Sequence, residues 1–165
     1  MSDKTRVLFV CHGNICRSPL AEGVFRQLVQ DAGVSDQFEI DSAGTSGYHE
    51  GDGPDPRTVA EAATRGLHLN HSARRMQAKD LERFDYILVM DAENHAAVNE
   101  MRRRALGTAI VKLLRSYDKT AGPAPDVPDP YYGGPGGFAD VHDMVERACR
   151  GLLSDLTSAS ARGDA

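Results

Sequence analysis

Four short apolar runs divide the chain, and each has the length of a buried strand. They occupy residues 7–10, 38–43, 86–90 and 109–114. The first, Val-Leu-Phe-Val, is continuously apolar, which is typical of a strand covered on both faces of a parallel sheet. The second alternates apolar and polar residues, as a strand does when its two faces differ. The pattern predicts four strands.

A helix is predicted directly after the first strand and a short loop. Ser18 is a favourable N-cap, and Pro19 suits the first helical position. Leu20, Val24 and Leu28 then recur at helical spacing. This helix therefore begins where the loop ends.

Two further helices carry the same kind of start signal. Asp55 and Pro56 predict a helix that runs to about Gly66, after a glycine-rich loop over residues 44–53. Asp91 predicts the cap of another helix, which reaches about Ala105. Strands and helices thus alternate along the chain.

The last helix is predicted from about Phe138 and follows a long irregular segment. Residues 116–137 are rich in proline and glycine. They predict a functional loop, because connections without a function are usually shorter. We expect residues 158–165 to be a flexible tail. The helix carries one apolar stripe, which includes Cys149 and predicts that this cysteine is a core residue. The stripe consists of Val141, Met144, Val145, Ala148, Cys149, Leu152 and Leu153.

This alternation predicts an α/β fold of three layers. A four-stranded parallel sheet would have helices on both faces, joined by right-handed crossovers, with ligands at the carboxyl ends of the strands. The length of 165 residues suits one domain, so we expect residues 1–165 to share a single core.

Composition and charge exclude several classes of function. A net charge of −5 gives no basic surface excess for nucleic acid, so we expect no nucleic-acid partner. The first apolar run is too short for a signal peptide or a membrane span, so we expect a cytoplasmic protein. Three cysteines without paired spacing predict neither a disulfide framework nor a zinc site. No HExxH motif, histidine cluster or Walker lysine occurs, so we expect no metal and no cofactor.

The loop between the first strand and its helix has the composition of a phosphate cradle. It spans residues 11–18 and is called the phosphate loop below. Its backbone amides and the helix N-terminus would converge on an anion, and this field favours the thiolate of Cys11. Arg17 offers a planar fork for two phosphoryl oxygens. We expect phosphate to be bound by His12, Gly13, Asn14, Ile15, Cys16, Arg17 and Ser18.

The loop resembles that of the low-molecular-weight protein tyrosine phosphatases, which reads C-x-G-N-x-C-R-S. Similar family segments follow in order along nearly the whole chain, ending with the start of the last helix: DSAGT (41–45), PDPR (54–57), HSARR (71–75), VMDAEN (89–94) and DPYYGG (129–134). The resemblance places a phosphatase loop after the first strand. It implies a metal-free hydrolase that acts on phosphotyrosine.

The resemblance also implies roles for individual residues. Cys11 would be the nucleophile and form a cysteinyl-phosphate, and Arg17 would clamp the phosphoryl group. Asp129 would protonate the departing tyrosyl oxygen and then activate the hydrolytic water. Asp126 is the nearby alternative, and either aspartate can also be read as a turn residue near proline.

A supporting network is implied around the loop. Asn14 tolerates a left-handed backbone, and in the family it is held together with Ser18, Ser42 and His71. Ser18, a helix cap on any interpretation, would donate to the Cys11 sulfur; His71 could instead be an ordinary surface histidine. Cys16 would form a reversible disulfide with Cys11, although it could simply fill loop space.

Substrate choice would depend on aromatic walls deep enough for a phosphotyrosine ring. The wall candidates are Tyr131 and Tyr132, with Tyr48 where many members carry tryptophan and His12 at a variable rim position. The implied partner is a tyrosine-phosphorylated protein, a tyrosine kinase among the candidates. Phosphate-like anions should inhibit.

Two rival functions remain open. A thiol-dependent arsenate reductase shares this fold and loop but needs further cysteines as a relay, and Cys149 lies on an apolar stripe. A non-catalytic phosphotyrosine-binding module would be expected to lose Cys11, Arg17 or Asp129, and the chain retains all three.

Overall fold

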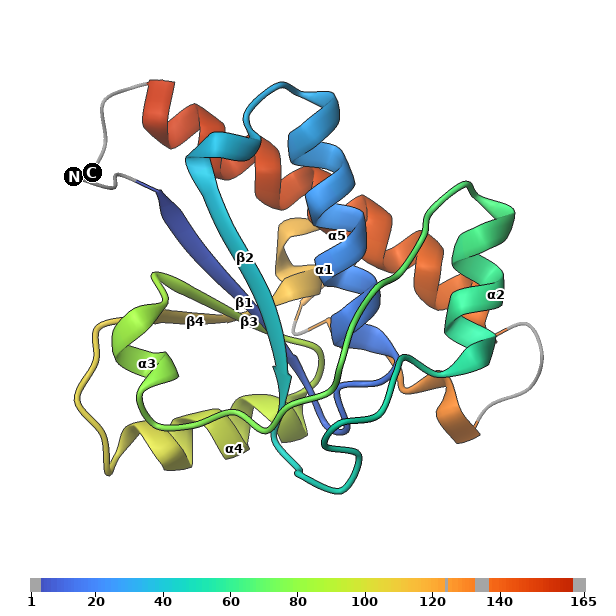
Figure 1. Cartoon of the computed structure of the whole chain (residues 1–165). Helices are drawn as coiled ribbons and strands as arrows, with labels where there is room; N and C mark the ends of the chain where they lie inside the picture. The colour runs from blue at the N-terminus through green and yellow to red at the C-terminus, as the bar shows by residue number, and fades with distance from the viewer. Residues whose placement is uncertain (1–3, 124, 133–136, 162–165) are drawn as a thin grey trace.

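One parallel sheet organises the computed structural model, which describes residues 4–123, 125–132 and 137–161 (Figure 1). Its strands are β1 (Thr5–Cys11), β2 (Phe38–Gly44), β3 (Tyr86–Val89) and β4 (Ile110–Leu113), in the order β2-β1-β3-β4. Every neighbouring pair is parallel. The four predicted strands and their parallel arrangement are confirmed.

The central strand β1 explains the continuous apolar run of the sequence. Residues 7–10 are fully buried, because helices cover both faces of the sheet. Val7 and Phe9 belong to one core cluster and Leu8 and Val10 to another, on the opposite face. Cys11 ends this strand at its carboxyl edge.

Helices form the two outer layers. One face carries α1 (Arg17–Asp31), α2 (Pro56–Thr64) and α5 (Gly137–Ala161), and the other carries α3 (Asp80–Arg83) and α4 (Ala92–Arg102) (Figure 1). The predicted three-layer α/β fold is confirmed.

The start of α1 differs from the prediction. Cys16, not Ser18, is its N-cap residue, and no side chain caps the helix. The Ser18 hydroxyl is turned into the phosphate loop, where Cys11 and Asn14 are its partners. The expectation that Ser18 caps the helix is therefore wrong, since its oxygen is used inside the site.

The other two predicted caps are confirmed. Asp55 accepts from the backbone of Arg57 at the start of α2, and Asp91 forms a reciprocal capping box with Asn94 at the start of α4. Both helices are slightly shorter than expected. The residue after the C-cap of α2 is Gly66, whose φ of 75° few other residues adopt.

The last helix is longer than predicted. It runs to Ala161, so residues 158–161 are helical rather than part of the flexible tail that we expected. The apolar stripe explains this, because Leu152 and Leu156 are buried against the core one turn apart. Residues 162–165, the rest of that predicted tail, lie outside the described part of the chain.

Four short elements have no counterpart in the sequence analysis. They are α3 and three 3₁₀ turns: η1 (Ser35–Gln37), η2 (Leu114–Tyr117) and η3 (Pro130–Tyr132). Each has three or four residues, too few to show a helical period. η3 lies inside the predicted functional loop.

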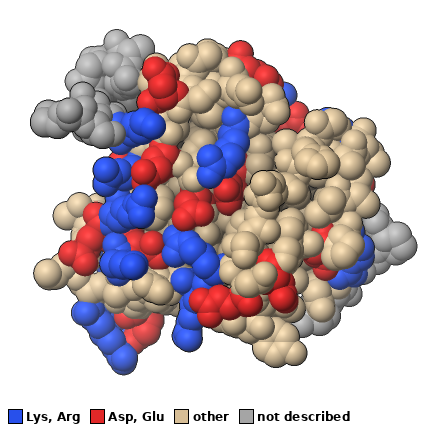
Figure 2. All heavy atoms as spheres, viewed as in Figure 1, with Lys and Arg blue, Asp and Glu red and all other residues tan. Residues whose placement is uncertain are grey.

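Charges of both signs are interleaved on the face seen in Figure 2, over β2, α3 and α4. Arg83 pairs with Glu39 at 3.1 Å, and Arg74 pairs with Asp80 at 3.0 Å. This face therefore presents no large field of one sign. Among the described helices, none has the length and apolar character needed to cross a bilayer.

Candidate active site

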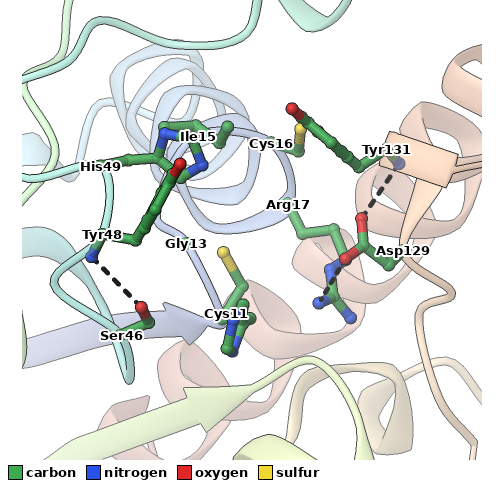
Figure 3. A pocket seen from close by; sticks show the side chains of 11 residues that line it. Cys11, Gly13, Ile15, Cys16, Arg17, Ser46, Tyr48, His49, Asp129 and Tyr131 are labelled. Carbon is green, nitrogen blue, oxygen red and sulfur yellow. Dashed lines mark hydrogen bonds and ion pairs between the residues drawn. The ribbon is translucent and has the colours of Figure 1, made fainter.

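A cavity of about 400 Å³ opens at the carboxyl end of β1 (Figure 3). The phosphate loop forms much of its wall, and two distant segments complete it. The lining residues are Cys11, His12, Gly13, Ile15, Cys16, Arg17, Ser46, Tyr48, His49, Asp129 and Tyr131. Most of the predicted site residues therefore meet at one place.

The Cys11 sulfur points into this cavity (Figure 3). Its Sγ lies 3.0 Å from the Ser18 Oγ and accepts a hydrogen bond from the Asn14 backbone N–H at 3.3 Å. Cys11 is 2% exposed. Hydrogen bonds of this kind stabilise a thiolate, the reactive form of cysteine.

Asn14 holds the loop in shape from inside. It is the one residue besides glycine with a positive φ in the described part of the chain, at 58°, which confirms the predicted left-handed backbone. Its Nδ2 donates to the Ser18 Oγ at 2.8 Å and to the Ser42 Oγ at 3.1 Å. Its Oδ1 accepts from the Arg74 backbone N–H at 2.9 Å.

His71 and Glu22 extend this network. The Nε2 of His71 lies 3.0 Å from the Asn14 carbonyl oxygen, and its Nδ1 lies 3.5 Å from Glu22 Oε1. The Ser42 hydroxyl donates to the same Glu22 oxygen at 2.6 Å. The structure thus brings together Asn14, Ser18, Ser42 and His71, as predicted from the resemblance.

Glu22 is a functional residue that the sequence analysis missed. Burial raises the pKa of its carboxyl, but hydrogen bonds from His71 and Ser42 and the charge of Arg26 outweigh burial, so the pKa is lowered. Glu22 lies one turn after Ser18 on α1, so the two side chains lie on the same face of the helix. A carboxylate on the face that carries a predicted site residue was the signal from which Glu22 could have been found.

The end of β2 approaches the loop closely. A Cβ on Gly44 would lie 2.7 Å from the His12 carbonyl oxygen and 3.1 Å from the Asn14 Cβ. The Ser46 backbone N–H donates to that same His12 oxygen. Only glycine leaves room for β2 and the phosphate loop to pack this closely.

Arg17 is buried at the cavity floor and oriented by two acceptors. Its Nη1 donates to Asp91 Oδ2 at 2.6 Å and to the Val127 carbonyl oxygen at 2.9 Å. Burial lowers the pKa of Arg17, but the negative charges of Cys11, Asp91 and Asp129 outweigh this and raise it. Asp91 was predicted only as a helix cap, yet its second oxygen fixes the arginine.

Asp129 faces Arg17 from the acid loop, the name used here for residues 126–132. Its Oδ2 lies 3.6 Å from Arg17 Nη2, and its Oδ1 accepts from the Tyr131 backbone N–H at 3.0 Å. Asp126 is exposed, does not line the cavity, and accepts from Arg115 through its backbone carbonyl. The structure therefore places Asp129 rather than Asp126 at the cavity.

Aromatic side chains form the outer wall. Tyr48 is 86% exposed and Tyr131 38% exposed, and both line the cavity together with His12. His49, which the sequence analysis missed, lies between them: its ring centre is 4.9 Å from that of Tyr48 and 6.5 Å from that of Tyr131. The side chain of Tyr132, the fourth predicted wall residue, lies outside the described part of the chain.

The three cysteines have different surroundings. Cys16 lines the cavity but is 5% exposed, and burial, with the charges of Asp55 and Cys11, raises the pKa of its thiol to about 12. Cys149 is fully buried, and burial raises the pKa of its thiol as well. Its Sγ lies 3.8 Å from the Ala21 carbonyl oxygen, which confirms the core position predicted for Cys149.

Known proteins share both sequence and fold with this chain. Residues 6–162 match the family model of the low molecular weight phosphotyrosine protein phosphatases. A low molecular weight protein-tyrosine-phosphatase from Streptomyces coelicolor is 51% identical over 150 residues, 90% of this chain and 92% of its own.

Solved structures agree with this relationship. A protein tyrosine phosphatase from Entamoeba histolytica has a TM-score of 0.86 at 34% identity, over 95% of this chain and 99% of its own. A Drosophila arginine phosphatase has a TM-score of 0.85 at 33% identity, over 91% and 96%. The chain thus belongs to the low molecular weight protein-tyrosine-phosphatase family of hydrolases.

Proposed function

We propose that the protein hydrolyses phosphotyrosine through a cysteinyl-phosphate on Cys11. The observation that carries this proposal is the meeting of three groups at one cavity: the Cys11 sulfur, the Arg17 guanidinium and the Asp129 carboxyl (Figure 3). They supply a nucleophile, a clamp for the phosphoryl oxygens and an acid for the leaving group.

In the first step the Cys11 thiolate attacks phosphorus. Arg17 uses Nη1 to hold Asp91 and Val127, which leaves the donors on Nε and Nη2 for two phosphoryl oxygens. The S–P bond forms as the P–O bond to tyrosine breaks. Asp129 gives its proton to the departing oxygen, because a phenolate with a pKa near 10 leaves slowly unprotonated.

In the second step Asp129 acts as a base. Its carboxylate takes a proton from water, whose oxygen attacks phosphorus as the S–P bond breaks. The electron pair returns to Cys11 sulfur, which the Ser18 hydroxyl and the Asn14 N–H can stabilise as a thiolate. Phosphate then leaves the loop.

Selectivity for phosphotyrosine over phosphoserine would follow from the depth of the cavity and from its aromatic wall. Tyr48, His49 and Tyr131 surround the mouth, and Ile15 gives the inner wall an apolar side chain. A tyrosyl ring can stack on such a wall, whereas a phosphoserine side chain is too short to reach the sulfur and the wall together.

The test is steady-state hydrolysis of a phosphotyrosyl peptide and its phosphoseryl twin. We expect turnover of the phosphotyrosyl peptide alone, and a loss of at least about 10⁴-fold in Cys11→Ser, which removes the thiolate. Absence of turnover by the reduced wild-type enzyme would overturn the proposal.

Two arms of this assay separate the rivals. A phosphoarginyl peptide is included because a related structure is that of an arginine phosphatase; faster turnover of this peptide would shift the proposal to phosphoarginine. Arsenate with a thiol reductant tests the reductase alternative. Against this alternative, the fully buried Cys149 is a poor relay thiol.

We further propose that Cys16 protects the nucleophile from oxidation. Hydrogen peroxide would oxidise the Cys11 thiolate to a sulfenic acid, and the Cys16 sulfur would displace hydroxide to give a disulfide and water. Thiol should then restore activity to peroxide-treated wild-type enzyme but not to Cys16→Ser. Equal recovery of both would contradict this role.

The partners follow from the chemistry. We propose a tyrosine-phosphorylated protein as substrate, with a tyrosine kinase among the candidates, and inhibition by phosphate-like anions that occupy the loop. A cytoplasmic location is proposed because a reactive thiol needs a reducing compartment. Competitive inhibition by inorganic phosphate is the simplest check on anion binding.

A further inference from the structure

Arg57, in the first turn of α2, lies where the acid loop meets the rest of the molecule. Its Nη1 donates to the Tyr131 carbonyl oxygen at 3.3 Å. Its guanidinium carbon lies 5.1 Å from the ring centre of Tyr131 and 4.7 Å from that of Phe138. One side chain thus contacts both the acid loop and the start of α5.

The other side of this guanidinium is fixed to Asp55. Nε and Nη2 of Arg57 donate to the two carboxylate oxygens of Asp55, at 3.1 and 2.9 Å. The Asp55 carboxylate is 6% exposed, and the Arg57 hydrogen bonds lower its pKa. A bidentate pair of this kind sets the plane of the guanidinium.

Asp55 is in turn attached to the phosphate loop. Its backbone N–H donates to the Ile15 carbonyl oxygen at 2.8 Å, and its carboxylate lies close enough to Cys16 to influence that thiol. The anchor of Arg57 is therefore hydrogen-bonded to the loop that carries Cys11.

The contacts continue from Arg57 to the acid itself. Arg57 holds the carbonyl of Tyr131, and the N–H of Tyr131 donates to Asp129 Oδ1. The Asp129 side chain is 36% exposed, and its Oδ2 lies 3.6 Å from Arg17 Nη2. A shift of Tyr131 would consequently shift the Asp129 carboxyl relative to the scissile oxygen.

We propose that Arg57 is a positioning residue that sets the distance between Asp129 and the nucleophile by tying Tyr131 to Asp55. This inference rests on the proposed function, because it assumes that Asp129 is the general acid. Arg57 is not among the residues that line the cavity, so we expect its main effect on protonation of the leaving group.

Leaving-group dependence tests this role. Phenyl phosphate releases a phenol as basic as tyrosine and needs the acid, whereas p-nitrophenyl phosphate releases a far more acidic phenol and needs it less. We compare kcat/KM for the two substrates and take their ratio. Both are measured in one sample, so the ratio does not depend on how much of a variant is folded.

Arg57→Ala should lower the phenyl to p-nitrophenyl ratio by about tenfold, a part of the 10²–10⁴ that a positioned acid contributes. Arg57→Lys should also lower it, because a single ammonium nitrogen lacks the planar fork whose three nitrogens reach both Asp55 oxygens and the Tyr131 carbonyl. In an Asp129→Asn background, Arg57→Ala should leave the ratio unchanged, since the acid is already absent.

Arg65→Ala is the matched control. Arg65 follows α2 as its C-cap residue and ties it to α5 through Asp143 and the Ala139 carbonyl, at 2.6 and 3.2 Å. Among the described residues, the hydrogen-bond partners of its side chain lie on α2 and α5 rather than on the acid loop. It should preserve the wild-type ratio even if the protein loses thermal stability.

The possible failures are distinguishable. If Arg57→Ala lowers both kcat/KM values equally, or lowers the ratio as strongly in the Asp129→Asn background, Arg57 is merely structural and the inference is overturned. If Asp129→Asn itself leaves the ratio unchanged, or the wild type hydrolyses neither substrate, the proposed function fails and the inference falls with it.

Discussion

The phosphate loop and the acid loop face each other across one cavity, but different kinds of contact hold them. Asn14 ties the phosphate loop to α1, β2 and the segment around residue 74 through buried side chains. Asp129 instead lies on an exposed turn and is held by a backbone N–H two residues away. Cys11 is positioned by the folded core, whereas Asp129 depends on a few contacts at the surface.

The comparison shows that stability and catalysis need not be lost together. A change in the phosphate loop disturbs buried hydrogen bonds, so it should affect both. A change of the acid carboxyl disturbs few buried contacts, so it should affect chemistry alone. Substitutions of Asp129, Asn14 and Glu22 test this separation.

Among the variants that compare the two loops, the largest effect on activity is expected for Asp129→Asn. The amide oxygen can still accept from the Tyr131 N–H, but no proton reaches the leaving group, so kcat/KM for a phosphotyrosyl peptide should fall by about 10²–10³. The free energy of unfolding should change by less than about 0.5 kcal/mol. A large loss of stability in urea unfolding would remove the contrast between the loops.

A smaller effect on activity and a large one on stability are expected for Asn14→Ala. It leaves the Ser18 and Ser42 hydroxyls and the Arg74 N–H with fewer partners, at a cost of about 2–4 kcal/mol in unfolding free energy. Asn14→Gly should recover about 1 kcal/mol of this, because glycine accepts a φ of 58° without strain.

Asn99→Ala is the control for that series. Asn99 lies on α4, and its side chain forms a hydrogen bond with His95 at 3.0 Å. Asn99→Ala should lower the free energy of unfolding by less than about 0.5 kcal/mol. If Asn14→Ala costs no more than this control, the buried network does not hold the phosphate loop.

The smallest expected effect is a pH dependence in Glu22→Gln. The folded pKa of Glu22 is lowered, so the carboxylate stabilises the fold above the ordinary glutamate pKa of about 4.3, and this stabilisation disappears as the pH falls through the folded value. At pH 7 the free energy of unfolding of the wild type should exceed that of the variant by about 1–2 kcal/mol. Urea unfolding from pH 7 to pH 3 measures the difference, and one that grows on acidification would contradict this assignment.

The fold was predictable wherever burial leaves a periodic signal. Residues 7–10 are apolar because both faces of β1 are covered, and the caps Asp55 and Asp91 act within their own helices. The four-residue helix α3 is too short to show a period. The prediction that Ser18 caps α1 was wrong for a different reason. A serine before proline is a favourable N-cap, but here its hydroxyl is hydrogen-bonded with Cys11 and Asn14 instead of the helix backbone.

The site was predictable where its residues are contiguous. The phosphate loop is one stretch of chain, so its anion-binding character is visible in the sequence. Glu22 and the second oxygen of Asp91 act on residues from other segments, so their roles appear only when the sheet brings those segments together. His49 was missed because the ring of Tyr131, which lies near it in space, belongs to a separate loop.

The strand order also explains why the cavity lies at the end of β1. β1 sits between β2 and β3, and the crossover through α1 leaves on one face while the crossover through α4 leaves on the other. Diverging connections open a crevice at such a topological switch point. Cys11 ends β1 and Asp91 follows β3, on the two sides of this crevice, so the connections of the sheet, rather than the side chains at the site, determine where the cavity lies.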